Sequence, residues 1–226
     1  MTLATLRAQC RLTTPSTTDW PNATLDGWIA DAIRFYSARF PRLWRYTQTL
    51  TTGTQQYNLP GAHGFFGILS VEYPAGQDPP EYLLPADPWS PAFQADDDVY
   101  AIYAIADTTA IESVTAAAQI WFAPAVTTGQ SAVITYHGLH AIPTAGDDDA
   151  QITIPTAHWE ALIAFVEFRA HWELESDEAY TATISSVILA QLGENARLAS
   201  NRVKEIFDFL TAHDARSVIV PWKMPR

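Results

Sequence analysis

The stretch at residues 24–41, TLDGWIADAIRFYSARFP, constrains the fold of this chain more than any other. Its apolar residues recur at steps of three and four, which places them on one face of an α-helix. They are Leu25, Trp28, Ile29, Ala32, Ile33, Tyr36 and Phe40. Thr24 is expected to cap the helix and Pro41 to end it, because the residue before a proline avoids the helical region. A face this wide and aromatic must pack against other helices or a sheet, and Ser37 is expected to lie off it.

Three further helices are predicted, one before this stretch and two near the end of the chain. The first covers residues 3–12 and is expected to turn Arg7 toward water. Later in the chain the apolar period returns to 3.6, which predicts helices at residues 156–175 and at about 186–212. The polar run at 176–178 is expected to separate them. The side chains predicted to form the common core are Trp28, Ile33, Leu162, Val166, Val203 and Phe207.

Between the two pairs of helices the sequence changes to short runs rich in β-branched and aromatic residues, separated by prolines and turns. The runs are residues 46–52, 55–59, 66–73, 82–84, 99–106, 114–122 and 132–137. Gly53 and Thr54 separate the first two runs, which predicts that these two pair as a hairpin. The whole pattern is typical of a small antiparallel sandwich or a barrel-like sheet.

The predicted fold is therefore α+β. It is a four-helix bundle of two N-terminal and two C-terminal helices, with a large antiparallel β insertion and an extended C-terminal tail. We expect residues 1–45 and 155–213 to form the bundle, residues 46–154 the β-rich insertion, and residues 214–226 a docking tail.

Known catalytic motifs are absent from the sequence: it has no Walker loop, no G-x-G-x-x-G, no H-E-x-x-H and no G-x-S-x-G. The single cysteine, Cys10, excludes an intrachain disulfide and a cysteine-based zinc site. His137 and His140 are close in sequence, but two ligands do not make a metal site and a third, such as Asp147, would be needed. We therefore expect no metal and no cofactor, and we predict that the chain is not an enzyme.

The charge and the hydropathy of the chain limit the kinds of partner that it is expected to bind. The 25 acidic residues outnumber the 13 Lys and Arg, giving a formal charge of -12, which argues against a broad surface that grips phosphates. No apolar run approaches the about 18 residues needed to span a bilayer, so no membrane contact is expected. The first residues lack the apolar core of a signal peptide, which favours assembly in a cytoplasm. The eight tryptophans lack interleaved basic residues, so we expect them in cores and interfaces.

Several stretches carry a resemblance to a known family. They are MTLATLRAQCR, TLDGWIADAIRFYSARFP, TQTLTTGTQQYNLP, FFGILSVEYP and LAQLGENARLASNRVKEIF. Together they resemble the head-to-tail adaptor proteins of tailed bacteriophages. The helical core resembles the connector family, and the β insertion resembles the podovirus type called tail tubular protein A. These stretches are packing patterns and not catalytic signatures.

The resemblance implies a structural virion protein in the neck, between capsid and tail, that is assembled in the host cytoplasm. Its subunits are expected to form a homo-oligomeric, dodecameric ring. The ring would bind the portal protein on one side and a tail or nozzle protein on the other. Double-stranded DNA would pass through the lumen during genome packaging and ejection, without sequence-specific binding, and an acidic lumen would keep it mobile. The alternative is a ligand- or carbohydrate-binding module that uses the β insertion and its aromatic residues.

Two groups of residues are candidate sites. The first is the apolar tail, where Pro221 and Pro225 block a helix and favour docking as an extended peptide. Its partner-binding residues are Val218, Ile219, Val220, Pro221, Trp222 and Met224. The partner is the portal or a neighbouring subunit, and docking on its own β domain is the alternative. The second group consists of acids that lack calcium-loop spacing and are candidates to face the lumen: Asp96, Asp97, Asp98, Asp147, Asp148 and Asp149.

Overall fold

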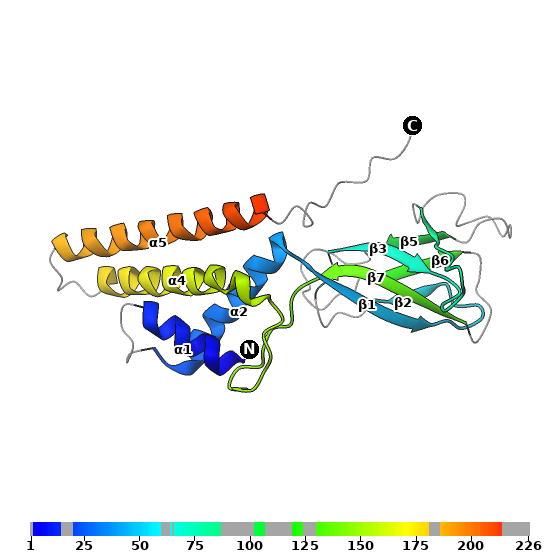
Figure 1. Cartoon of the computed structure of the whole chain (residues 1–226), viewed down its shortest axis with the longest axis horizontal. Coiled ribbons are helices and arrows are strands. Elements are labelled where there is room, and N and C mark those ends of the chain that lie inside the picture. The colour runs from blue at the N-terminus through cyan, green and yellow to red at the C-terminus, as the bar shows by residue number, and fades with distance from the viewer. Residues whose placement is uncertain are drawn as a thin grey trace. The chain divides into compact units, whose positions relative to one another are not determined.

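The computed structural model of the chain describes residues 2–14, 20–59, 64, 66–86, 102–106, 119–123, 130–180 and 186–213. The chain divides into two compact units. One comprises Met1–Phe40 and His140–Arg226, and the other comprises Pro41–Leu139. The described helices belong to the first unit and the named strands to the second (Figure 1). The predicted α+β fold, with four packed helices and antiparallel sheets between their two pairs, is confirmed.

The described residues contain four α-helices, whose bounds are α1 Leu3–Thr13, α2 Asn22–Arg39, α4 Trp159–Tyr180 and α5 Ser186–His213. A 3-10 turn, η2 (Thr156–His158), leads into α4. Thr24 is not the cap of α2, because the helix begins two residues earlier and the Thr24 N–H donates to the Pro21 carbonyl at 3.1 Å. The predicted break at 176–178 is also wrong. That run contains neither glycine nor proline, and polarity alone does not end a helix.

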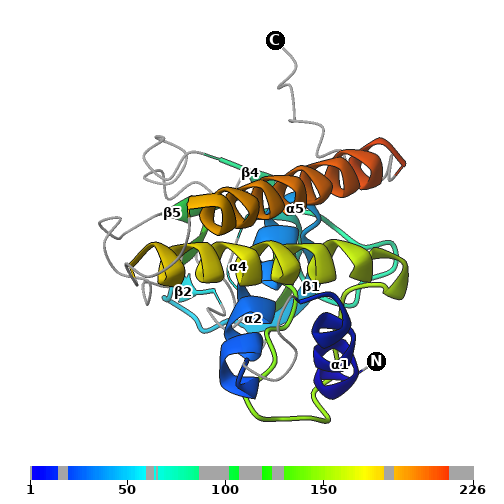
Figure 2. The ribbon, with the colours of Figure 1, turned by 90° about the vertical axis from the view of Figure 1, so that its left-hand side faces the viewer.

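The helical unit has a single apolar core. Figures 1 and 2 show α4 lying between α5 and α1, with α2 packed against α4. Every residue of the apolar face predicted for α2 is buried, from Leu25 to Phe40. The six side chains predicted for the core are also buried, and Ile33 is completely enclosed. The aromatic face of α2 therefore finds the helical neighbours that its pattern requires.

The strands of the second unit form two sheets. The three-stranded sheet has the order β1-β7-β3, and all its pairs are antiparallel. The four-stranded sheet has the order β2-β6-β5-β4, in which the pairing of β4 with β5 is parallel and the others are antiparallel. The bounds are β1 Arg42–Thr49, β2 Gln56–Asn58, β3 Gly67–Glu72, β4 Leu84–Pro85, β5 Ile102–Ala106, β6 Gln119–Ala123 and β7 Ser131–Gly138. Buried residues of both sheets share one core.

The predicted hairpin between the first two β runs is wrong. β1 pairs with β7 and β2 pairs with β6, so the turn at Gly53, where φ is 79°, carries the chain from one sheet to the other. The Tyr57 hydroxyl accepts a bond from the Thr51 N–H at 2.8 Å and lies 3.1 Å from the Thr54 carbonyl. This side chain thus satisfies backbone groups at the turn, and the strands on either side gain burial by pairing with partners distant in sequence.

Candidate interaction surfaces

A buried ion pair joins α1 to α2. Arg7, predicted to face water, is only 4% exposed. Its Nε lies 2.9 Å from Oδ1 of Asp26 and its Nη2 lies 3.0 Å from Oδ2, which is the bidentate geometry of a strong charge-assisted pair. Burial lowers the pKa of Arg7, but hydrogen bonds to Asp148 and Asp26 outweigh it and raise the pKa above its ordinary value.

The same ion pair fixes the loop that precedes η2. Nη1 of Arg7 donates to Oδ1 of Asp148 at 2.8 Å, and the Gly146 N–H donates to Oδ2 of Asp26 at 3.1 Å. Backbone bonds add to these contacts, because the Leu3 N–H donates to the Ala150 carbonyl at 2.9 Å. The loop is therefore held to both N-terminal helices, although its carboxylates are exposed.

A second polar network lies where the chain leaves the helical unit at Phe40 and returns to it at His140. The His140 N–H donates to Oγ of Ser37 at 3.0 Å, and Ser37 in turn donates to the Ile33 carbonyl at 2.6 Å. On the imidazole ring, Nε2 lies 3.2 Å from the Phe40 carbonyl and Nδ1 lies 3.1 Å from Oγ1 of Thr153. Ser37, expected off the buried face, is fully enclosed because it serves this network.

Neither histidine considered as a metal ligand lies in a metal site. His140 is used by the network just described, while His137 lies on β7 in the other unit, where burial lowers its pKa. Within the described ranges there is no group of three His, Cys, Asp or Glu side chains that could hold a metal ion. None of the described helices is long and apolar enough to cross a membrane.

The structure describes only some of the predicted site residues. Asp147, Asp148 and Asp149 are exposed, and Asp148 also contacts Arg7. The other candidate acids, Asp96, Asp97 and Asp98, lie outside the described residues. So do the tail residues Val218, Ile219, Val220, Pro221, Trp222 and Met224.

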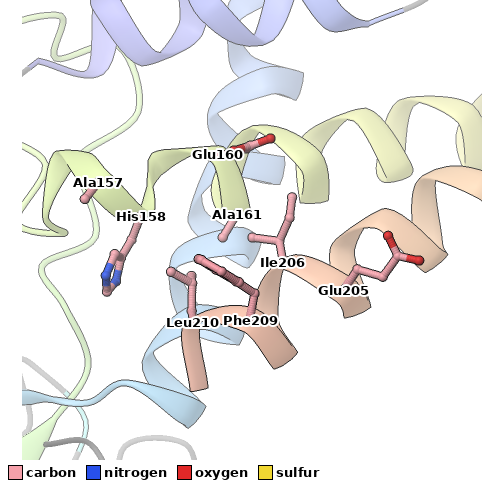
Figure 3. Close-up of a pocket in the computed structure, with 8 residues that line it drawn as sticks. All are labelled: Ala157, His158, Glu160, Ala161, Glu205, Ile206, Phe209 and Leu210. Carbon is pink, nitrogen blue, oxygen red and sulfur yellow. The ribbon is translucent and has the colours of Figure 1, made fainter. Parts of the chain in front are cut away.

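Two hollows on the helical unit are candidate contact surfaces that the periodicity did not indicate. The first, which we call the α4–α5 groove, has a volume of about 300 Å³ and lies between the beginning of α4 and the end of α5 (Figure 3). Its lining residues are Ala157, His158, Glu160, Ala161, Glu205, Ile206, Phe209 and Leu210. The figure shows Ala161 and Ile206 directed toward each other from the two helices.

The second hollow has a volume of about 320 Å³ and lies among α2, α4 and α5. Phe35 forms one wall, with its ring centroid 5.3 Å from that of Phe165 and 5.0 Å from that of Phe207. Arg39 covers this cluster, its guanidinium 5.3 Å from the Phe207 centroid, in a cation–π arrangement. Basic and aromatic groups thus share this surface, whereas glutamates border the α4–α5 groove.

Large apolar side chains are exposed on both units. They are Leu12, Phe35, Leu43, Phe66, Leu69, Tyr82, Leu84, Trp172, Leu198 and Phe209. Where such side chains form a contiguous patch, they commonly mark contact with other proteins.

Comparison with known proteins agrees with this architecture. Residues 1–216 match the family model for the SU10 adaptor protein. No curated protein matches the sequence. The match covers both pairs of helices and the whole β insertion, and it ends just before the apolar segment that follows Arg216. The resemblance to phage adaptors is thereby confirmed: the chain belongs to the SU10 adaptor protein family and is a structural, non-enzymatic adaptor of the bacteriophage virion.

Proposed function

We propose that this chain is the subunit of a ring that connects the portal to the tail in the neck of the virion. The observation that carries the proposal is the family match over residues 1–216, which includes all described elements of both units. A head-to-tail connector must contact itself, the portal above and a tail or nozzle protein below. The exposed apolar side chains on both units supply surface for several such contacts.

Charge supports the passage of DNA through the ring. A formal charge of -12 gives a surface that repels the phosphate backbone, so DNA would move past it without adhering. Asp147 and Asp149 lie on a loop that is fixed to α1 and α2 through Arg7 and Asp148, and they are exposed. In a ring, this firmly held acidic loop is a suitable lumen lining, and Asp96, Asp97 and Asp98 are the corresponding candidates in the insertion.

The alternative of a carbohydrate-binding module has no comparable support. The β insertion lies wholly within the family match, and the hollow on its three-stranded sheet is bordered by Arg45 and Glu72, which pair with each other at 3.0 Å. Trp44 and Tyr82 also line this hollow, but the family match covers the insertion and favours the adaptor function.

The proposal is tested by mixing the purified chain with the portal protein of the same phage. Negative-stain images should show a second ring stacked on the portal, and mass measurement should give a dodecamer of the 25.0 kDa chain. A portal mixed with an unrelated acidic protein of similar size is the control. A chain that stays monomeric and separates from the portal at every ratio tested would refute the ring.

A further inference from the structure

The sequence after α5 differs in charge from the rest of the chain. Residues 216–226, RSVIVPWKMPR, contain two arginines and one lysine and no acidic residue, in a chain whose formal charge is -12. They also carry the apolar side chains of Val218, Ile219, Val220, Trp222 and Met224. A complementary site for this segment must combine an apolar floor with an acidic border.

The α4–α5 groove has both properties. Ala157, Ala161, Ile206 and Leu210 supply apolar lining, and Glu160 and Glu205 supply carboxylates. Among the described residues, Arg202 pairs with one of these acids, Glu160. It lies 3.3 Å from Glu160 and also 2.9 Å from Glu167, so one guanidinium is shared between two carboxylates and Glu205 adds a third. The border of the groove therefore keeps a net negative charge.

The dimensions of the groove suit a peptide better than a folded element. Its volume of about 300 Å³ is at the small end of ligand sites in proteins, enough for one or two side chains. Trp222 is the largest apolar side chain of the segment, and a buried tryptophan is a frequent source of binding energy. Pro221 and Pro225 restrict the free segment, which lowers the entropy lost on docking.

We propose that the α4–α5 groove binds residues 216–226 of a neighbouring copy of this chain, with Trp222 in the groove and Lys223 facing Glu205. The proposal rests on the ring described above. A ring of identical subunits needs two different surfaces on each chain that fit one another, because its contacts run head to tail. The basic apolar segment and the acidic apolar groove form such a pair.

The first experiment measures the affinity of the segment for the groove. A fluorescein-labelled peptide of residues 214–226 is titrated into the chain truncated after His213, and anisotropy gives the Kd. Trp222→Ala in the peptide should weaken binding about thirtyfold, as expected for an anchor residue. Glu205→Lys in the protein should weaken it by about twofold to fivefold, and a Lys223→Glu peptide should restore it.

Asp208→Lys is the matched control, because it makes the same charge change on the same helix at an exposed residue that does not line the groove. It should leave the Kd within about twofold of the parent, as expected for a screened surface charge. If Asp208→Lys and Glu205→Lys weaken binding equally, attraction is non-specific and the groove is not the site. If the peptide binds the portal but not the truncated chain, the proposal is overturned.

A mixing experiment tests whether the segment of one copy binds the groove of another copy. One variant lacks residues 214–226 and keeps the groove, and the other has Ala157→Trp to fill the groove and keeps the segment. Ala157 is exposed, so this substitution should leave the circular dichroism and the melting temperature of the chain unchanged. Each variant alone should be monomeric by light scattering, and the mixture should form heterodimers. A mixture that stays monomeric means that the segment does not bind the groove of another copy, which refutes the proposal.

Ring formation by the unaltered chain with the portal is measured in parallel. If that ring forms and both variants also form it normally, the inference fails while the proposed function stands. If the unaltered chain forms no ring but the heterodimer appears, the docking inference stands and the proposed function fails.

Discussion

Removing the carboxylate of Asp26 should destabilise the helical unit severely, because three donors converge on it. Nε and Nη2 of Arg7 and the N–H of Gly146 all donate to this carboxylate within 3.1 Å. Both charged side chains are 4% exposed, so water cannot replace the lost partner. Breaking a buried ion pair by removing one member costs about 3–5 kcal/mol.

The lower end of that range is expected for Asp26→Ala, about 3 kcal/mol, since Arg7 would keep one bond to Asp148. Asp148→Ala is the matched control. Its carboxylate pairs with the same arginine at 2.8 Å but is 64% exposed, and an ion pair with an exposed partner contributes about 0–1 kcal/mol. The predicted result is thus a difference of about 2 kcal/mol or more between the two substitutions.

Urea unfolding followed by circular dichroism measures both variants, and the midpoint should fall without a change in slope. A double variant, Arg7→Met with Asp26→Leu, should recover most of the stability lost in Asp26→Ala, because it removes both buried charges together. Equal losses for Asp26→Ala and Asp148→Ala, or a loss below about 1 kcal/mol for Asp26→Ala, would show that the pair is solvated and that the reasoning from burial is wrong.

Three further predictions concern the helical core. Ile33→Ala should lower the free energy of unfolding by about 2–5 kcal/mol in a urea titration, since Ile33 is fully buried. Ser37→Ala should cost about 1–3 kcal/mol by leaving the His140 N–H without its acceptor, whereas the exposed Ser200→Ala should change little. Burial raises the pKa of Cys10 to about 12, so at pH 8 the thiol stays protonated and should react with a thiol reagent only as the chain unfolds; fast labelling of the native chain would contradict this.

The periodicity of apolar residues predicted those features of the fold that a local sequence pattern can determine. The apolar faces of α2, α4 and α5 follow from spacing alone, because a helix places residues three and four apart on one side whatever it packs against. Strand pairing is different. β1 lies beside β7, some ninety positions away in the chain, and nothing local to either strand specifies that choice. The turn at Gly53 therefore predicted a hairpin that the structure does not have.

The residues at the candidate sites were harder to predict than the core, because their contacts also come from distant parts of the chain. Helical spacing predicts that Arg7 faces water and that Ser37 lies off the apolar face, yet each is buried by a partner from a distant part of the chain. A signal for the Arg7 pair was present in the sequence, because Asp26 lies three residues before Ile29 and seven before Ile33 and so shares their face of the helix. The α4–α5 groove gave no signal at all, since a groove arises from two helices together.

The network around His140 leads to a last prediction, that the helical unit folds without the β insertion. Nε2 of His140 lies 3.2 Å from the Phe40 carbonyl, so the two points where the insertion joins the helical unit are already adjacent. The helical unit also has its own core, and none of the described residues between 41 and 139 belongs to it. Replacing residues 41–139 by a six-residue Gly-Ser linker halves the length of the loop about four times. The entropic cost of closing the loop should therefore fall by about 2 kcal/mol. The excised chain should therefore show a helical spectrum and a cooperative urea transition, and His140→Ala in it should lower the midpoint. A non-cooperative transition would mean that the helices depend on the insertion, and a midpoint that His140→Ala does not change would mean that the His140 network does not stabilise the helical unit.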